Sequence, residues 1–203
     1  TPVFAIQGYV DTLLDGAMED PATAKRFLER TAKNVHRLTH LLTDLDQIAK
    51  LERGEIVVTK EPFVMQELIQ EVFETKLTKA EKKQISCRIK KESESPVLVF
   101  ADKEKIRQVL TNLISNAIKY GKQGGEVVAS VYKTDGKRIL IEITDDGVGI
   151  PEAELPRVFE RFYRTEAGRS MDLTGSGLGL SICKHILEAH GQSIHVRSTE
   201  NIG

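Results

Sequence analysis

Two asparagines lie four residues apart in a segment whose apolar residues follow helical spacing. Asn112 and Asn116 share one side of the predicted helix 102–120 with Lys119 and Tyr120, because positions i, i+4, i+7 and i+8 lie on one face. Asparagine is poor in a helix interior, since its amide competes for backbone hydrogen bonds. One asparagine would be surface decoration, but two in line with a lysine and a tyrosine predict a ligand-binding face. An amide oxygen suits Mg²⁺, a lysine suits phosphate, and a tyrosine ring suits a flat base.

A second candidate is the run DDGVGI over 145–150, which follows a predicted strand over 138–144. The carboxylate of Asp145, at the end of that strand, can accept a hydrogen bond from the exocyclic amine of adenine. Gly147 and Gly149 would let the backbone approach a ligand closely. The alternative is a simple turn, because Asp-Gly pairs are common in turns.

A third candidate is the run TGSGLGL over 174–180, which opens the last predicted helix, 176–190. Glycine-rich turns at helix N-termini present free N–H groups to phosphates. The run lacks the Gly-Lys-Ser/Thr ending of a P-loop. Between the second and third runs, Arg161 and Arg164 could reach phosphates, the alternative being an amphipathic helical turn. The polar stretch 165–174 predicts a mobile flap over the ligand.

Residues 1–53 are expected to form two helices that break near Gly16. Asp20 is placed to cap the second helix and Pro21 to occupy its first turn. Apolar residues of the second helix recur with heptad spacing and form a wide stripe. A lone hairpin cannot bury a stripe of this width, which favours two hairpins pairing as a dimeric four-helix bundle. The alternative is a hairpin packed on the rest of its own chain. The heptad residues are Leu28, Thr31, Val35, Leu38, Leu42, Leu45 and Ala49.

Strand and helix patterns alternate after residue 53. We expect strands at 56–59, 85–89, 97–100, 127–132, 138–144 and 193–198, with helices at 65–82, 102–120 and 176–190. The mixture lacks a strict βαβ repeat, so it predicts an α+β class, with an α/β sandwich in which helices cover one face of a sheet. The predicted domains are therefore 1–53 and 54–203.

The composition limits the possible partners of the chain. The 203 residues carry a formal net charge of -1, and only 5% are aromatic, which argues against nucleic-acid binding. No apolar run approaches the roughly 20 residues of a membrane helix, so we expect no direct membrane contact. Cys87 and Cys183 are interpreted as small buried apolar residues, which suits a reducing cytoplasm.

In this order and spacing, the four segments around Asn116, Asp145, Arg164 and Gly177 resemble the N, G1, F and G2 boxes of sensor histidine kinases. The resemblance covers nearly the whole chain. It implies the ATP-binding sandwich shared with gyrase, Hsp90 and MutL, preceded by a dimerising hairpin. The implied activity is ATP-dependent transfer of the γ-phosphoryl group to a histidine and then to an aspartate of a response regulator receiver domain, with possible phosphatase activity. The implied cofactors are ATP and Mg²⁺.

The resemblance also implies a role for each motif residue. Asn116 would coordinate Mg²⁺, Tyr120 would pack on adenine, Asp145 would accept from its amino group, and Arg164 would face the γ-phosphate. The residues expected to bind ATP are Asn112, Asn116, Lys119, Tyr120, Asp145, Gly147, Gly149, Ile150, Arg161, Arg164, Thr174, Gly175, Gly177, Leu178, Gly179 and Leu180.

Two departures from the family pattern bear on the expected site. Asp146 stands where the family usually has asparagine, and we expect its side chain to point away from the pocket. The chain opens on what resembles the end of the H box, where the acceptor histidine lies four residues before the threonine. We therefore expect a fragment of a larger sensor without that histidine, in which Thr1 would occupy the position that orients water for phosphate removal. The full-length protein would be anchored in the bacterial inner membrane.

Two other functions fit parts of the same pattern. A clamp ATPase of the gyrase, Hsp90 and MutL type would need a following transducer domain with a catalytic lysine. A non-catalytic dimeric scaffold would keep a dead pocket, against which the intact Asn116 and Asp145 argue.

Overall fold

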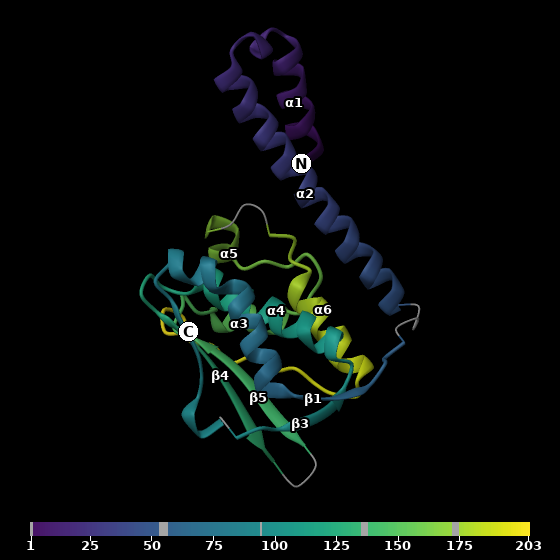
Figure 1. The fold of residues 1–203 in the computed structure, drawn as a ribbon, viewed down its shortest axis with the longest axis vertical. Coiled ribbons are helices and arrows are strands. Elements are labelled where there is room, and N and C mark those ends of the chain that lie inside the picture. Colours follow the sequence, from purple (N-terminus) through teal and green to yellow (C-terminus); the bar gives the residue numbers. More distant parts are fainter. Residues whose placement is uncertain (1, 53–56, 94, 135–137, 172–174) are drawn as a thin grey trace. The chain divides into compact units, whose positions relative to one another are not determined.

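The computed structural model describes residues 2–52, 57–93, 95–134, 138–171 and 175–203, and the chain divides into two compact units, Thr1–Gly54 and Glu55–Gly203. The first unit is a helical hairpin of α1 (Pro2–Leu14), the short 3-10 helix η1 (Ala17–Glu19) and α2 (Pro21–Glu52), drawn in purple and blue in Figure 1. Gly16 turns the chain with a positive φ of 110°, a conformation that glycine adopts without steric cost.

The predicted cap of the second helix is confirmed. The Asp20 carboxylate accepts hydrogen bonds from the N–H groups of Ala22 (3.2 Å) and Thr23 (3.3 Å), and Pro21 is the first residue of α2. Inside the hairpin the Tyr9 and Phe27 rings lie 5.7 Å apart and Leu13 is buried. The side chains of Leu28, Val35, Leu42 and Leu45 remain exposed.

The second unit combines helices with two small sheets. Its elements are β1 (Glu61–Val64), α3 (Met65–Lys82), β2 (Ser86–Ile89), η2 (Lys91–Ser93), β3 (Leu98–Ala101), α4 (Lys103–Tyr120), β4 (Glu126–Lys133), β5 (Ile139–Asp145), η3 (Glu152–Arg157), α5 (Glu166–Met171) and α6 (Gly179–Ala189). Strand β4 pairs in parallel with β2 and antiparallel with β5, and β1 pairs antiparallel with β3. The predicted α+β class is confirmed.

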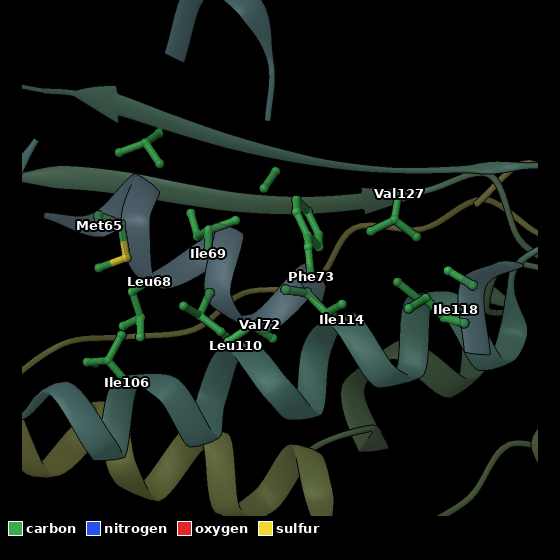
Figure 2. Close-up of a cluster of buried hydrophobic side chains, with 14 of the residues drawn as sticks. Met65, Leu68, Ile69, Val72, Phe73, Ile106, Leu110, Ile114, Ile118 and Val127 are labelled. Atoms are coloured by element: carbon green, nitrogen blue, oxygen red, sulfur yellow. The ribbon is translucent and has the colours of Figure 1, made fainter. Parts of the chain in front are cut away.

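The core lies between the strands and two helices. In Figure 2, Ile69 and Phe73 lie on the side of α3 that faces the strands, whereas Leu68 and Val72 lie on the side that faces α4. Strand β4 contributes Val127, and α4 contributes Ile106, Leu110, Ile114 and Ile118 to the same cluster. Helices α3 and α4 both contact the strands and each other, and α4 also contacts α6.

The N-terminal end of α4 joins three segments through one residue. The Asp102 carboxylate accepts from the N–H groups of Lys105 (3.0 Å) and Thr59 (3.1 Å), and its own N–H donates to Nε2 of His190 (3.2 Å). Nδ1 of His190 lies 2.7 Å from the Ile186 carbonyl oxygen, so the ring holds the end of α6 against the start of α4.

Two predicted strands differ from the structure. The strand predicted at 56–59 is wrong for Val57–Thr59; β1 forms from Glu61 instead, because Phe63 lies opposite Val99 in a ladder and is buried, whereas Val57 is exposed. Over 193–198 burial alternates as in a strand, yet no strand is present there, because alternation alone supplies no ladder partner. The polar stretch 165–174 contains helix α5.

Candidate functional site

The ligand-binding face predicted on α4 is directed toward the start of α6. Asn112, Asn116, Lys119 and Tyr120 are all half-buried, between the buried core side of α4 and solvent. The Asn112 amide nitrogen donates to the Gly179 carbonyl oxygen (3.3 Å), and Nζ of Lys119 lies 4.8 Å from the Tyr120 ring centroid. The structure therefore brings the first and third candidate runs together, although 67 residues separate the hydrogen-bonded pair.

The two neighbouring aspartates at the end of β5 have different surroundings. Oδ1 of Asp145 accepts from the Gly147 N–H (3.0 Å). Burial raises the pKa of the Asp145 carboxyl, the Gly147 N–H opposes that rise, and the Asp146 carboxylate adds to it. Oδ1 of Asp146 instead accepts from the backbone N–H of Glu126 (3.1 Å), at the start of β4. Asp146 is thus engaged in the sheet, and Asp145 is the carboxylate available to a ligand.

The glycines of the second run allow close contacts within the protein itself. A Cβ atom at Gly147 would lie 2.6 Å from both the Tyr120 carbonyl oxygen and Oδ1 of Asp145. The next residue, Val148, donates its N–H to that same carbonyl (3.2 Å). Because the chain must lie this close to the end of α4, Asp145 is held next to Tyr120. Glycine at 147 thus allows the run to lie against the end of α4, and the close approach of a ligand to these glycines stays a prediction.

Gly149 and Ile150 pack on the C-terminal residues. Gly149 has a φ of +66°, and a Cβ atom there would overlap the Thr199 carbonyl. The Ile150 N–H donates to Oγ of Ser198 (2.8 Å). The Asn201 N–H donates to the Val148 carbonyl (2.8 Å), so the whole run is fixed to the chain end.

The third run turns into α6 against the segment 159–164. Gly177 has a φ of +74°, and a Cβ atom there would lie 2.8 Å from the Tyr163 carbonyl oxygen, so only glycine fits. Leu178 is fully buried and therefore anchors the turn from inside, whereas Leu180 is half-buried. The first N–H groups of α6 lie at Gly179, beside Asn112.

The two arginines of the segment 159–164 contact different partners. Arg164 donates to the carbonyl oxygens of Gly168, within α5, and of Gly175 (3.0 Å). Arg161 lies 3.4 Å from Nε2 of His185 on α6. A Cβ atom at Gly168 would lie 3.5 Å from the Tyr120 hydroxyl, so α5 covers the edge of that ring.

Two predicted site residues, Thr1 and Thr174, lie outside the described residues, as does the predicted boundary at 53–54. Lys83, which follows α3, belongs to none of the predicted motifs. Its ammonium nitrogen donates to the carbonyl oxygens of Lys119 (2.6 Å) and Gly121 (3.2 Å), at the end of α4. A lysine after a helix is ordinary in sequence, so only the fold identifies this contact.

The donor groups near α4 fit a magnesium nucleotide better than a metal held by the protein alone. Within the described ranges, no three His, Cys, Asp or Glu side chains form a group that could hold a metal ion. Half-buried Asn116, one turn from Asn112, offers a hard amide oxygen. Mg²⁺ commonly takes one or two protein ligands and completes its shell with phosphates and waters.

Two family models match separate parts of the chain. The family described as Histidine kinase-, DNA gyrase B-, and HSP90-like ATPase matches residues 101–203, and the His Kinase A (phospho-acceptor) domain matches residues 1–54. The sensor histidine kinase WalK of Bacillus subtilis (strain 168) is 35% identical over 207 residues, which cover 100% of this chain and 33% of that protein. The chain thus spans about a third of the length of this curated relative.

Solved structures agree in fold. The Acinetobacter baumannii histidine kinase AdeS matches with a TM-score of 0.70 and 25% identity, over 93% of this chain and 84% of that one. The histidine kinase ThkA, solved in complex with the response regulator protein TrrA, matches with a TM-score of 0.77 and 26% identity, over 100% of this chain and 55% of that one. Within the described ranges, no helix has the length and apolar character needed to cross a bilayer.

Proposed function

This chain belongs to the sensor histidine kinases, within the wider family of histidine kinase-, DNA gyrase B- and HSP90-like ATPases, and we propose that it is their ATP-dependent phosphotransferase portion. Residues 54–203 bind ATP with Mg²⁺, and residues 1–53 form the dimerisation and phosphotransfer hairpin. The γ-phosphoryl group passes to a histidine of the full-length protein and then to an aspartate of a response regulator. The observation that carries the proposal is the meeting of α4, the run after β5 and the start of α6.

The adenine end of the site uses Asp145 and Tyr120. The Asp145 carboxylate accepts a hydrogen bond from the exocyclic amine, and the Tyr120 ring packs on the base. Their proximity supports this pairing, because Gly147 contacts both residues. Glycine at 147 and 149 serves the site by fixing the run that carries Asp145.

The phosphate end uses the other half of the α4 face. Asn116 would hold Mg²⁺ through its amide oxygen, and the ion, when bound, neutralises charge on the phosphate oxygens. Lys119 contacts phosphate directly. Asn112 orients the start of α6 through its hydrogen bond to Gly179. The N–H groups of the first turn of α6 would face the phosphates.

Two arginines extend the site toward the γ-phosphate. Arg164 already connects the Gly168 and Gly175 carbonyls, and Arg161 lies beside His185. Both have the bidentate donor geometry that suits phosphate oxygens. The remaining members of the binding set, Ile150, Thr174, Gly175, Gly177, Leu178 and Leu180, shape the backbone around the nucleotide.

Catalysis in this proposal rests on positioning and charge neutralisation, because phosphoryl transfer needs little covalent chemistry from the protein. Donors fixed by the fold do not reorganise during the reaction, which favours the charge distribution of the transition state. Thr1 would act in the separate phosphatase reaction, where it would orient the water that attacks the phosphoryl group on the regulator's aspartate and releases inorganic phosphate.

The hairpin supports a homodimer. Leu28, Val35, Leu42 and Leu45 follow the heptad pattern and remain exposed in one chain. A second hairpin would bury them in a four-helix bundle. The complex of ThkA with TrrA supports a response regulator receiver domain as the second partner. We place the chain on the cytoplasmic side of the bacterial inner membrane.

The clamp ATPase and the scaffold are less well supported. The match of residues 1–54 to the phospho-acceptor domain favours a kinase over a clamp ATPase. A scaffold does not require a half-buried carboxylate with a raised pKa at the end of the strand that meets α4.

The test is calorimetric titration of the chain with ATP and Mg²⁺. Replacing Asp145 by Asn keeps the shape but places an amide donor against the adenine amine, so we expect the dissociation constant to rise by about tenfold or more. The matched control is Asp146→Asn, which retains the acceptor for Glu126 and should leave the affinity within about twofold. Equal effects of both substitutions would contradict the proposed adenine contact.

A further inference from the structure

Lys83 connects the end of α3 to the end of α4. Its Nζ donates to the carbonyl oxygens of Lys119 (2.6 Å) and Gly121 (3.2 Å) and is half-buried there. The backbone of Lys83 is itself fixed, since its N–H donates to the Ala80 carbonyl (3.0 Å) and its carbonyl accepts from the Gly124 N–H (2.9 Å). The ammonium group is therefore carried by a well-supported backbone rather than by a loose turn.

The backbone carbonyls at the end of α4 accept hydrogen bonds from two different segments. The Lys83 ammonium group donates to the carbonyls of residues 119 and 121, and the Val148 N–H donates to the carbonyl of Tyr120 (3.2 Å). Carbonyls in the last turn of a helix have no partner within the helix, and a cation is favoured there by the helix dipole. The three carbonyls are thus bound in alternation, by an ammonium group and by the run that carries Asp145.

The approach of the two segments is close. A Cβ atom at Gly121 would lie 2.7 Å from the Ala117 carbonyl oxygen and 2.9 Å from Cδ1 of Ile85, which is two residues beyond Lys83. Glycine at 121 therefore lets the turn after α3 contact the end of α4. This contact brings the ammonium group within hydrogen-bond distance of both carbonyls.

The two residues whose backbone is held in this way are the proposed ligand contacts. Lys119 and Tyr120 present the phosphate-binding and adenine-binding groups, and their side chains lie 4.8 Å apart, measured from Nζ to the ring centroid. We propose that Lys83 is a positioning residue for nucleotide binding, which fixes the last turn of α4 so that Lys119 and Tyr120 face the nucleotide. This inference rests on the proposed function, because it concerns how the same site is held.

The experiment is titration of the chain with ATP and Mg²⁺, together with the midpoint of thermal unfolding. Lys83→Met keeps the aliphatic stem and removes the ammonium group. We expect it to weaken ATP binding by about tenfold, because charge-assisted hydrogen bonds to two carbonyls are lost. The matched control is Lys82→Met, at the exposed lysine that ends α3 next to Lys83, which should leave the affinity within about twofold.

A double-mutant cycle separates positioning from general stability. If Lys83 acts through Lys119 and Tyr120, the loss caused by Lys83→Met should shrink in at least one of the Lys119→Ala and Tyr120→Ala backgrounds. A folded Lys83→Met variant with unchanged affinity overturns the inference, and so does a loss that is equal in the unmutated chain and in both of these backgrounds.

A second variant serves if Lys83→Met does not fold. Lys83→Gln retains an amide donor without the charge and should weaken ATP binding by about threefold. Unchanged affinity in that variant overturns the inference. If the unmutated chain does not bind ATP, the proposed function fails, and the role of Lys83 fails with it.

Discussion

The two units of this chain use apolar residues in opposite ways. In the second unit the side chains of Leu68, Ile69 and Ile114 are completely buried within one chain. In the hairpin, Leu28 and Leu42 keep 58% and 59% of their surface exposed, although both follow the heptad pattern. The second unit therefore has its own core, whereas the hairpin leaves apolar side chains of its heptad pattern on the surface.

The difference has a consequence for how each unit is stabilised. A unit with an internal core has a stability that does not depend on protein concentration, whereas a unit whose apolar stripe is completed by a second copy is stabilised by association. Mutations in the two units should therefore be told apart by their concentration dependence.

The largest effect is expected in the core of the second unit. Leu68→Ala removes a completely buried side chain and should lower the free energy of unfolding by about 3 kcal/mol. Leu77→Ala is the matched control on the same helix, where the leucine is 54% exposed, and should cost less than about 1 kcal/mol. Urea denaturation at two protein concentrations measures both. A strong concentration dependence of the Leu68→Ala effect would break the comparison.

A smaller effect is expected in the hairpin, and it should appear in association. Leu42→Ala removes two apolar side chains per dimer and should raise the dimer dissociation constant by about 100-fold. Sedimentation equilibrium measures this constant. Glu29→Ala, at an exposed position of the same helix, serves as the control. Association unaffected by Leu42→Ala would favour the alternative in which the hairpin packs on its own chain.

The smallest effect is expected from the aspartates that cap one helix in each unit, Asp102 in the second unit and Asp20 in the hairpin. Asp102 caps α4 and is buried, with both oxygens occupied by Lys105 and Thr59; its replacement by Ala should cost about 2 kcal/mol. Asp20 caps α2 at an exposed position with longer bonds, so Asp20→Ala should cost less. Thermal unfolding of the two variants measures the difference, and equal losses would contradict the dependence on burial.

Much of the candidate site could be predicted from the residues. The four motif segments were found because each combines residue types that are costly or unusual in plain structure, such as asparagine inside a helix. The helices α3 and α4 and the caps at Asp20 and Asp102 followed from local spacing and composition. The roles assigned to individual site residues stay predictions that the proposed titrations can test.

Other features could not be read locally. The strand predicted at 56–59 was displaced to Glu61–Val64, because a strand exists only where another strand lies beside it. The segment 193–198 shows the opposite case, in which burial alternates without a ladder. The opposite environments of Asp145 and Asp146 also depended on the chain that lies beside each of them.

By itself the sequence determined which groups are available, in what order, and on which elements they lie. It fixed the helical face from Asn112 to Tyr120, the carboxylate at the end of β5 and the glycines that alone tolerate their φ angles. Only the tertiary structure decided which of these groups meet and what holds them. Lys83 is the clearest case, since its ammonium group acts 36 residues away on carbonyls that any helix end possesses. Hydrogen bonds to backbone carbonyls are independent of side-chain identity at the acceptor, so no sequence pattern marks them.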